Sequence, residues 1–204
     1  METIKVIILV LSMSFGFQGF AQSNARQTAF SKSYEFENKA NYPAAIKEVE
    51  KHYAANDYFT NIRLGWLYYL NKNYSESIKF YNKAIALKPY AIEARFGCVK
   101  PLSAIESWAK VKAHYQQILK IDPQNTTANY WLGVIFYNSK DYNSANQLFE
   151  KVINLYPLDY DSVIMLAWTK WRLGKNNDAK VLFQHALTMR PTDASALEGL
   201  KLIK

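Results

Sequence analysis

Few side chains in this 204-residue chain could carry out catalysis or bind a metal ion. The three histidines, His52, His114 and His185, lie far apart and show none of the paired spacings that bind zinc. The one cysteine, Cys98, excludes an intramolecular disulfide and a cysteine-rich zinc site. It occupies an apolar position of a predicted helix, where a packed thiol is favoured over a nucleophile. Since a glycine-rich phosphate loop is also missing, the sequence predicts a protein that is not an enzyme and has no cofactor or metal site.

The composition fits a folded protein with a basic surface. Hydrophobic residues make up 50% of the chain, which is enough to form a buried core and excludes intrinsic disorder. There are 25 Lys and Arg against 17 Asp and Glu, and the net charge of +8 favours association with anionic surfaces. The basic residues are dispersed, however, and do not form the stripe with interleaved aromatic residues that nucleic acid binding requires. We therefore expect no nucleic acid partner.

Residues 1–21 have the three-part pattern of a secretory signal peptide. Lys5 supplies a basic start, residues 6–11 form an unbroken apolar run, and residues 19–21 have the small-x-small pattern of a cleavage site. We expect cleavage after Ala21, no stable membrane insertion afterwards, and a secreted or periplasmic location. The alternative is an uncleaved anchor, although the apolar stretch is shorter than the ~20 residues needed to span a bilayer.

The rest of the chain has a strict internal period. Four of the six prolines follow one another at intervals of 34 residues, namely Pro89, Pro123, Pro157 and Pro191. Aligning the chain on them produces a fully aromatic position, occupied by Tyr81, Tyr115, Phe149 and Phe183. An apolar position appears in the same way, occupied by Leu64, Cys98, Leu132 and Leu166. A fixed period of this length indicates an array of structural repeats.

Each repeat reads as two helices joined by a short turn, because its apolar residues recur at helical spacing. In the repeat that starts at Tyr58, residues 71–73 predict the turn, and Pro89 marks the end of the second helix. One such pair cannot bury its apolar faces alone, so neighbouring pairs must stack. Gly65 and Gly133 are predicted at the points where two helices approach closely, since only glycine leaves room there.

These motifs resemble the tetratricopeptide repeat family. The resemblance rests on Leu-Gly-Trp-Leu-Tyr at residues 64–68, followed by Tyr74 and Pro89, and on Leu-Gly-Val-Ile-Phe at residues 132–136, followed by Pro157. It implies an all-α fold, a right-handed α-solenoid of stacked helix-turn-helix units with a C-terminal capping helix. The resemblance covers the chain from about residue 29 to its end.

We divide the chain accordingly. The segments are a signal peptide (1–21), a degenerate N-terminal helix pair (22–57), a repeat (58–91), a distorted repeat (92–125), two further repeats (126–159 and 160–193) and a capping helix (194–204). In the distorted repeat Val99 replaces a small residue and Pro101 falls inside the first helix, which predicts a kink or wider helix spacing. In the last repeat Lys170 stands where an aromatic residue is usual.

The resemblance implies that the first helix of each repeat lines a concave face. Carried over position by position, this face comprises Phe59, Ile62, Trp66, Tyr69, Phe96, Lys100, Tyr130, Val134, Tyr137, Ile164, Trp168, Trp171 and Arg172. Contiguous apolar surfaces of this kind usually mark binding sites. We therefore expect an adaptor that holds a protein or peptide partner in an aromatic groove, with Lys100 and Arg172 orienting acidic groups of the partner.

Three alternatives stay open at this point. The aromatic residues could pack on one another, or under the degenerate first repeat, and only stiffen a narrow groove. The chain could be a structural subunit or assembly factor of an envelope complex that uses its convex face. A carbohydrate or other small ligand could stack on Trp66 or Trp168. The sequence does not identify the partner or the oligomeric state, and the terminal-carboxylate clamp of some family members does not transfer, because the matching positions here are largely aromatic or aliphatic.

Overall fold

The structure is a computed structural model that describes residues 24–203. The predicted signal peptide and its cleavage site lie outside these residues. All regular secondary structure within the described range is helical, which confirms the predicted all-α class. The chain divides into two compact units, unit 1 ending at Glu106 and unit 2 beginning at Ser107.

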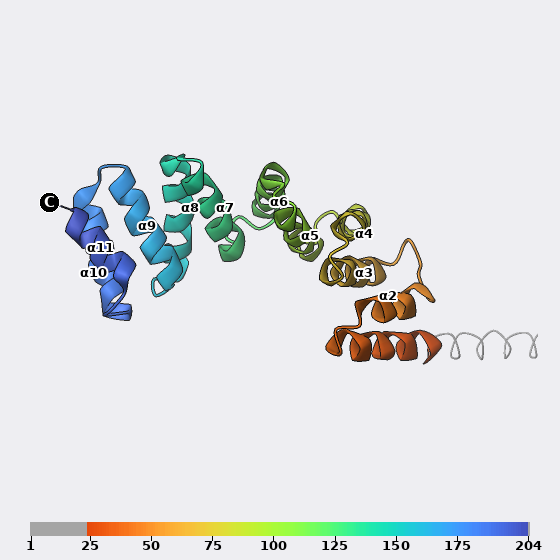
Figure 1. The fold of residues 1–204 in the computed structure, drawn as a ribbon. Helices are drawn as coiled ribbons and strands as arrows, with labels where there is room; N and C mark the ends of the chain where they lie inside the picture. Colours follow the sequence, from red (N-terminus) through yellow and green to blue (C-terminus); the bar gives the residue numbers. More distant parts are fainter. Residues whose placement is uncertain (1–23, 204) are drawn as a thin grey trace, which may run out of the picture. The chain divides into compact units, whose positions relative to one another are not determined.

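The described part of unit 1, residues 24–106, contains helical residues 24–38 and four further helices. These are α2 (Tyr42–Glu50), α3 (Tyr58–Leu70), α4 (Tyr74–Leu87) and α5 (Glu93–Ala104). Helix α3 packs against α2 on one side and α4 on the other, and α5 contacts both α3 and α4 (Figure 1). Between these helices lies a core of apolar residues that includes Val49, Leu64 and Phe80.

Unit 2 contains six helices. These are α6 (Trp108–Ile121), α7 (Thr126–Asn138), α8 (Tyr142–Leu155), α9 (Tyr160–Arg172), α10 (Asn176–Met189) and α11 (Ala194–Leu202). Helices α7 and α8 form one pair, α9 and α10 form the next, and α11 lies against both α9 and α10 (Figure 1). Below we call α3, α5, α7 and α9 the first helices of their repeats, and α4, α6, α8 and α10 the second helices.

Most helices begin at an Asp or Asn whose side chain accepts a hydrogen bond from a first-turn amide. The capping residues are Asn41, Asp57, Asn73, Asn125, Asp141, Asp159 and Asp193. In the last of them, the Asp193 carboxylate accepts the amide of Ala196 at 2.8 Å, which defines the start of α11. Such caps satisfy amides that have no partner inside the helix.

A residue with positive φ recurs in the turns within the repeats. Lys72, Glu106, Lys140 and Gly174 lie 34 residues apart and have φ values of 59°, 55°, 65° and 73°. A left-handed residue at this point closes the preceding helix and turns the chain into the next one. Three of these positions have side chains that disfavour positive φ, so residue type did not reveal them.

Glycine and aromatic residues interlock between the paired helices, as the sequence predicts. A Cβ atom added to Gly65 would lie 3.0 Å from the ring of Tyr81, and one added to Gly133 would lie 2.8 Å from the ring of Phe149. Tyr81 and Phe149 are themselves buried. The close approach of first and second helices therefore depends on a residue without a side chain opposite each ring.

The predicted repeat 92–125 is divided by the boundary between the units, since α5 belongs to unit 1 and α6 to unit 2. Helix α5 continues through Pro101 to Ala104. Its close contact with α4 is made by Gly97, where an added Cβ would lie 2.2 Å from the Tyr81 ring. Gly65 and Gly97 therefore both lie against the Tyr81 ring, whereas Val99 occupies the position that corresponds to Gly65 in the alignment.

Candidate binding surfaces on the first helices

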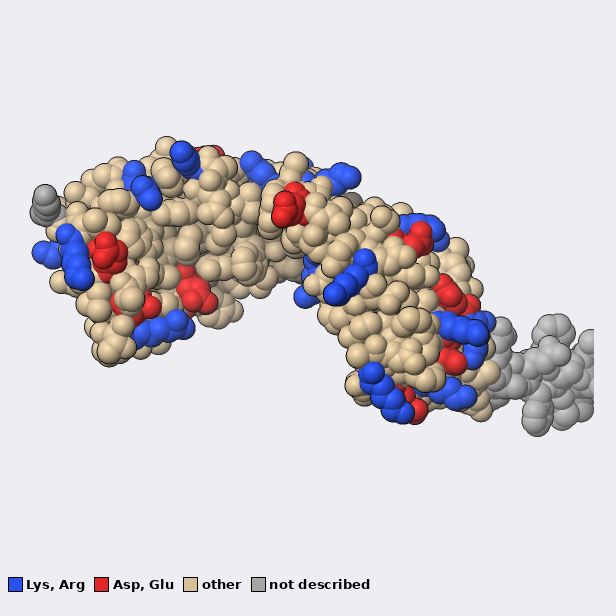
Figure 2. Space-filling view, in the orientation of Figure 1, with Lys and Arg blue, Asp and Glu red and all other residues tan. Residues whose placement is uncertain are grey.

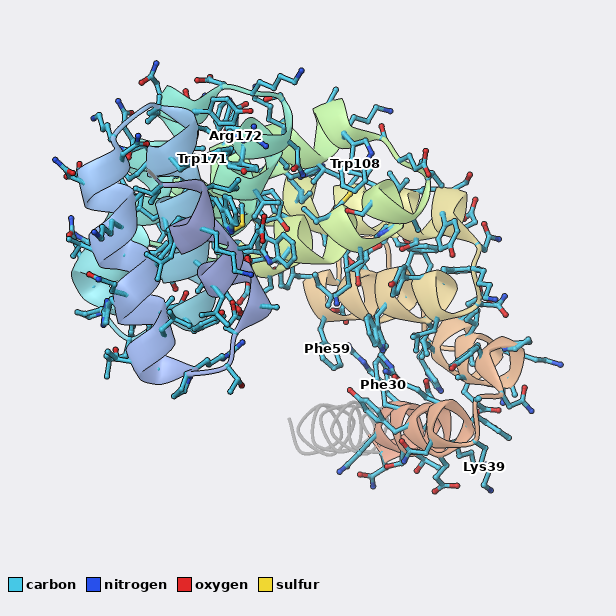
Figure 3. The ribbon with its side chains drawn as sticks, turned by 60° about the vertical axis from the view of Figure 1, so that its left-hand side comes forward. Phe30, Lys39, Phe59, Trp108, Trp171 and Arg172 are labelled. Carbon is cyan, nitrogen blue, oxygen red and sulfur yellow. The ribbon has the colours of Figure 1, made fainter. Side chains whose placement is uncertain are left out.

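In unit 1 the predicted groove residues lie on α3 and α5. They are Phe59, Ile62, Trp66, Tyr69, Phe96 and Lys100. The Phe59 side chain is 50% exposed, and its ring stacks on Phe30 with 5.3 Å between centroids. Figure 3 shows these two rings pointing toward each other between helical residues 24–38 and α3. Part of the predicted binding surface of α3 is therefore used in packing against the N-terminal helix.

Trp66 is also bound to the N-terminal helix. Its indole N–H donates a hydrogen bond of 2.6 Å to the Glu37 carboxylate. Lys100 places its Nζ atom 5.5 Å from the Trp66 ring centroid, and the Tyr69 ring lies 5.6 Å from the same ring. The exposed ammonium group of Lys100 and the partly exposed rings form an amphipathic surface on α3 and α5.

A buried ion pair beneath this surface was not predicted from the sequence. The Arg63 side chain is only 5% exposed, and its guanidinium pairs with Glu37 and donates to the Ser33 hydroxyl at 3.1 Å. It also lies 3.9 Å from the centroid of the Tyr34 ring. A buried charge is costly unless it is paired, so this arrangement specifies how helical residues 24–38 dock on α3.

In unit 2 the predicted groove residues lie on α7 and α9. They are Tyr130, Val134, Tyr137, Ile164, Trp168, Trp171 and Arg172. Trp168 is used in packing within unit 2. Its indole N–H donates to the Ser195 hydroxyl at 2.8 Å, and its ring centroid lies 4.9 Å from that of Phe183. It therefore joins α9 to α10 and α11.

Tyr137 and Arg172 form a second cluster, at the carboxyl ends of α7 and α9. A hydrogen bond to Tyr137 raises the pKa of Arg172 above its ordinary value. The Arg172 guanidinium lies 4.7 Å from the Trp171 ring, and the Tyr137 ring lies 5.4 Å from that of Tyr142. Arg172 is exposed and lies beside Trp171 at the end of α9 (Figure 3). The structure thus brings together predicted residues from two consecutive first helices.

Lys170 shows what replaces the usual aromatic contact in the last repeat. Its Nζ atom lies 2.6 Å from Glu150 of α8, and its side chain is 12% exposed. An ion pair between α8 and α9 therefore occupies the position of an aromatic side chain. The charge of the nearly buried Lys170 ammonium group is thereby neutralised.

The described residues offer little of the chemistry that catalysis needs. Within residues 24–203, His, Cys, Asp and Glu form no group of three or more that could hold a metal ion. Cys98 is fully buried in α5, while His114 and His185 lie on separate helices, α6 and α10. Over the same range, each helix is too short or too polar to cross a membrane.

Charged side chains are interspersed on the surface. Figure 2 shows Lys and Arg scattered among Asp and Glu over each unit on the face that it presents. This face shows no continuous basic stripe of the kind that tracks a nucleic acid backbone.

The fold defines a class of protein, an all-helical repeat protein in which helix pairs stack side by side. Three tetratricopeptide repeat models match the sequence, at residues 58–91, 127–159 and 160–193. These matches support a tetratricopeptide repeat protein, and their bounds coincide closely with the pairs α3–α4, α7–α8 and α9–α10. No curated protein was found to match the chain.

Solved structures resemble the fold at low sequence identity. A tetratricopeptide repeat protein from Parabacteroides merdae is 18% identical with a TM-score of 0.74, covering 87% of this chain and 71% of that one. MamA from Desulfovibrio magneticus RS-1 is 14% identical with a TM-score of 0.69, covering 83% and 97%. YrrB, described as having an unusual peptide-binding site, is 18% identical with a TM-score of 0.66, covering 87% and 91%. At these identities the similarity concerns the fold alone.

Proposed function

We propose that this protein is a non-enzymatic scaffold that binds a protein partner through its first helices, after export to the periplasm or the extracellular space. The observation that carries the proposal is the cluster of Tyr137, Trp171 and Arg172 at the ends of α7 and α9. Aromatic residues and arginine are the side chains that most often carry binding energy at protein interfaces. Arg172 is held by its neighbours yet remains exposed, so it can pair with an acidic group of the partner.

Unit 1 offers a comparable surface of its own. Phe59 and Lys100 are exposed there, and Trp66 and Tyr69 are partly exposed beside them. A lysine beside aromatic rings suits a partner segment that combines apolar and acidic side chains. The peptide-binding site for which YrrB is described supports the general idea, since YrrB has a similar fold.

The experiment is affinity capture from the envelope and secretion fractions with the processed chain as bait. The test variant is Tyr137→Ala combined with Arg172→Ala. The matched control is Lys151→Ala combined with Lys180→Ala, two exposed residues on the second helices α8 and α10. Loss of a captured protein by the test variant alone, with unchanged helical content, supports the proposal. Equal capture by both variants would remove this cluster from the binding surface.

Export is tested on the same preparation. Processing at the proposed site predicts that the purified chain begins at Gln22. Recovery of the chain from the cytoplasm with its first 21 residues intact would contradict the proposed location.

The second candidate is an assembly role in which the second helices and loops contact a larger complex. It is favoured by exposed apolar residues outside the first helices, namely Val181 at 64%, Leu158 at 76% and Tyr156 at 59%. Capture that is lost on Val181→Asp but retained by the Tyr137 and Arg172 variant would favour this alternative.

A further inference from the structure

A pocket of about 270 Å³ lies where the first turns of α7 and α9 meet, away from the Arg172 cluster. Two aromatic rings line it, those of Tyr130 and Trp131, with centroids 5.2 Å apart and planes at 79°. The Trp131 side chain is 48% exposed, so part of its ring is available to a ligand. Two carboxylates, Asp159 and Asp161, complete the lining from the side of α9.

The carboxylates have no basic counterpart. Within the described residues, neither Asp159 nor Asp161 forms an ion pair with Lys, Arg or His, although the chain has a net charge of +8. Their charges act on Tyr130 in the pocket. Burial is the main reason that the pKa of Tyr130 is raised, and the negative charges of Asp161 and Asp159 raise it further. The pocket is therefore a locally negative site on a basic protein.

Helix capping explains part of this arrangement but not all of it. Asp159 accepts the amide of Ser162 at 2.9 Å, and Asp161 lies in the first turn of α9, where the helix dipole favours a negative charge. Capping does not explain why the Trp131 indole is exposed beside these carboxylates, or why the hydroxyl of Ser162 has no partner. Ser162 is fully buried and lines the pocket, yet its Oγ atom has no hydrogen-bond partner among the described residues. A buried polar atom without a partner is costly unless a ligand or water satisfies it.

We propose that this pocket binds the guanidinium group of an arginine side chain presented by a protein partner. Trp131 supplies the face on which the guanidinium plane stacks, and Asp161 accepts its N–H groups, with the Ser162 hydroxyl as a further acceptor. Arginine suits the site better than lysine because its planar cation stacks on aromatic rings and directs several N–H donors at once.

The surface beside the pocket supports a protein as the source of the arginine. A second hollow, of about 430 Å³, shares Asp159 with the pocket and is lined by Leu155, Tyr156, Pro157 and Leu158. Leu155, Tyr156 and Leu158 are all exposed. This apolar shelf gives the rest of a partner segment a place to lie next to its arginine. In assigning the arginine to a protein partner, the inference rests on the proposed function.

The test is an NMR titration of the ¹⁵N-labelled full chain, purified as the host processes it. The probes are N-acetyl-arginine-N-methylamide, its lysine counterpart, and the citrulline counterpart, which is neutral and nearly isosteric with arginine. We expect saturable shifts at the Trp131 indole N–H and at the amides of Asp161 and Ser162, strongest for arginine and absent for citrulline. Asp161→Asn is expected to raise the dissociation constant about tenfold, whereas Glu198→Gln, at an exposed acid of α11, leaves it unchanged.

Several results would overturn the inference. They are equal binding of citrulline, equal binding of lysine, shifts that do not involve the pocket, and an Asp161→Asn variant that binds as the parent does. Each spectrum also reports whether the variant is folded. The proposed function fails separately, through unchanged capture by the Tyr137 and Arg172 variant, so the two failures are distinguishable.

Discussion

Gly199 of α11 is a position where one added methyl group should have a large effect on stability. A Cβ atom there would lie 2.2 Å from Cζ of Phe183 and 2.4 and 2.5 Å from its two Cε atoms. Phe183 is fully buried and its ring is held 4.9 Å from that of Trp168, so it has little room to retreat. On an exposed helix surface Gly→Ala stabilises by about 1 kcal/mol. Here three contacts of 2.2–2.5 Å place the cost of overpacking in the upper part of the usual range, at about 2–3 kcal/mol, so we expect Gly199→Ala to destabilise by about 1–2 kcal/mol.

The prediction becomes sharper in a double-mutant cycle with Phe183→Leu. Leucine lacks the three ring atoms that would meet the added methyl group. In the Phe183→Leu background, Gly199→Ala should therefore stabilise by up to about 1 kcal/mol, as helix propensity alone dictates. The sign of the effect reverses between backgrounds, and the coupling of about 2 kcal/mol exceeds the usual error of additivity.

Urea unfolding monitored by circular dichroism measures these differences. Glu198→Ala, at the exposed neighbouring position on α11, is the control and should change stability by less than about 0.5 kcal/mol. Because a terminal helix can open separately from the rest of a repeat array, amide exchange in α11 provides a second readout. Stabilisation by Gly199→Ala in both backgrounds would refute the interlock of α11 with Phe183.

Three further predictions concern Trp168, Glu37 and Asp141. Trp168→Ala should destabilise by about 3–5 kcal/mol, against about 1 kcal/mol or less for Tyr137→Ala, in urea unfolding. Glu37→Ala should cost about 2–3 kcal/mol and release helical residues 24–38 to faster amide exchange, since it leaves a buried guanidinium unpaired. Hydrogen bonds from Ser144 hold the pKa of Asp141 below its ordinary value, so its stabilising charge is present above about pH 4 and is lost as pH falls. Asp141→Asn should accordingly be less stable than the parent at neutral pH. The difference in the free energy of unfolding should disappear when urea unfolding is repeated at progressively lower pH.

The repeat architecture was predictable because it depends on local pattern. The prolines at 34-residue intervals and the glycines Gly65 and Gly133 are visible in the sequence, and the structure places turns and close helix contacts there. The turn positions with positive φ were not visible, because Lys72, Glu106 and Lys140 are not residues that favour that conformation. Their geometry follows from the closure of the preceding helix rather than from side-chain preference.

The fate of individual groove residues could not be predicted, because it depends on contacts between distant segments. Trp66 and Trp168 occupy the same position in their repeats, but Glu37 and Ser195 lie on terminal helices outside the regular period. The pocket beside Trp131 was missed for a related reason. The equivalent position holds Arg63 in the first regular repeat and Gly97 in the next, so the alignment shows no pattern there.

The central claim is that a protein partner lies against the first helices, and site-specific photo-crosslinking tests it most directly. Benzoylphenylalanine is placed in the full-length chain either instead of Tyr137, on α7, or instead of Val181, on the second helix α10. Irradiation in the native host should link one partner protein to position 137 and leave position 181 unlinked. A partner linked at position 181 and not at position 137 would contradict the account.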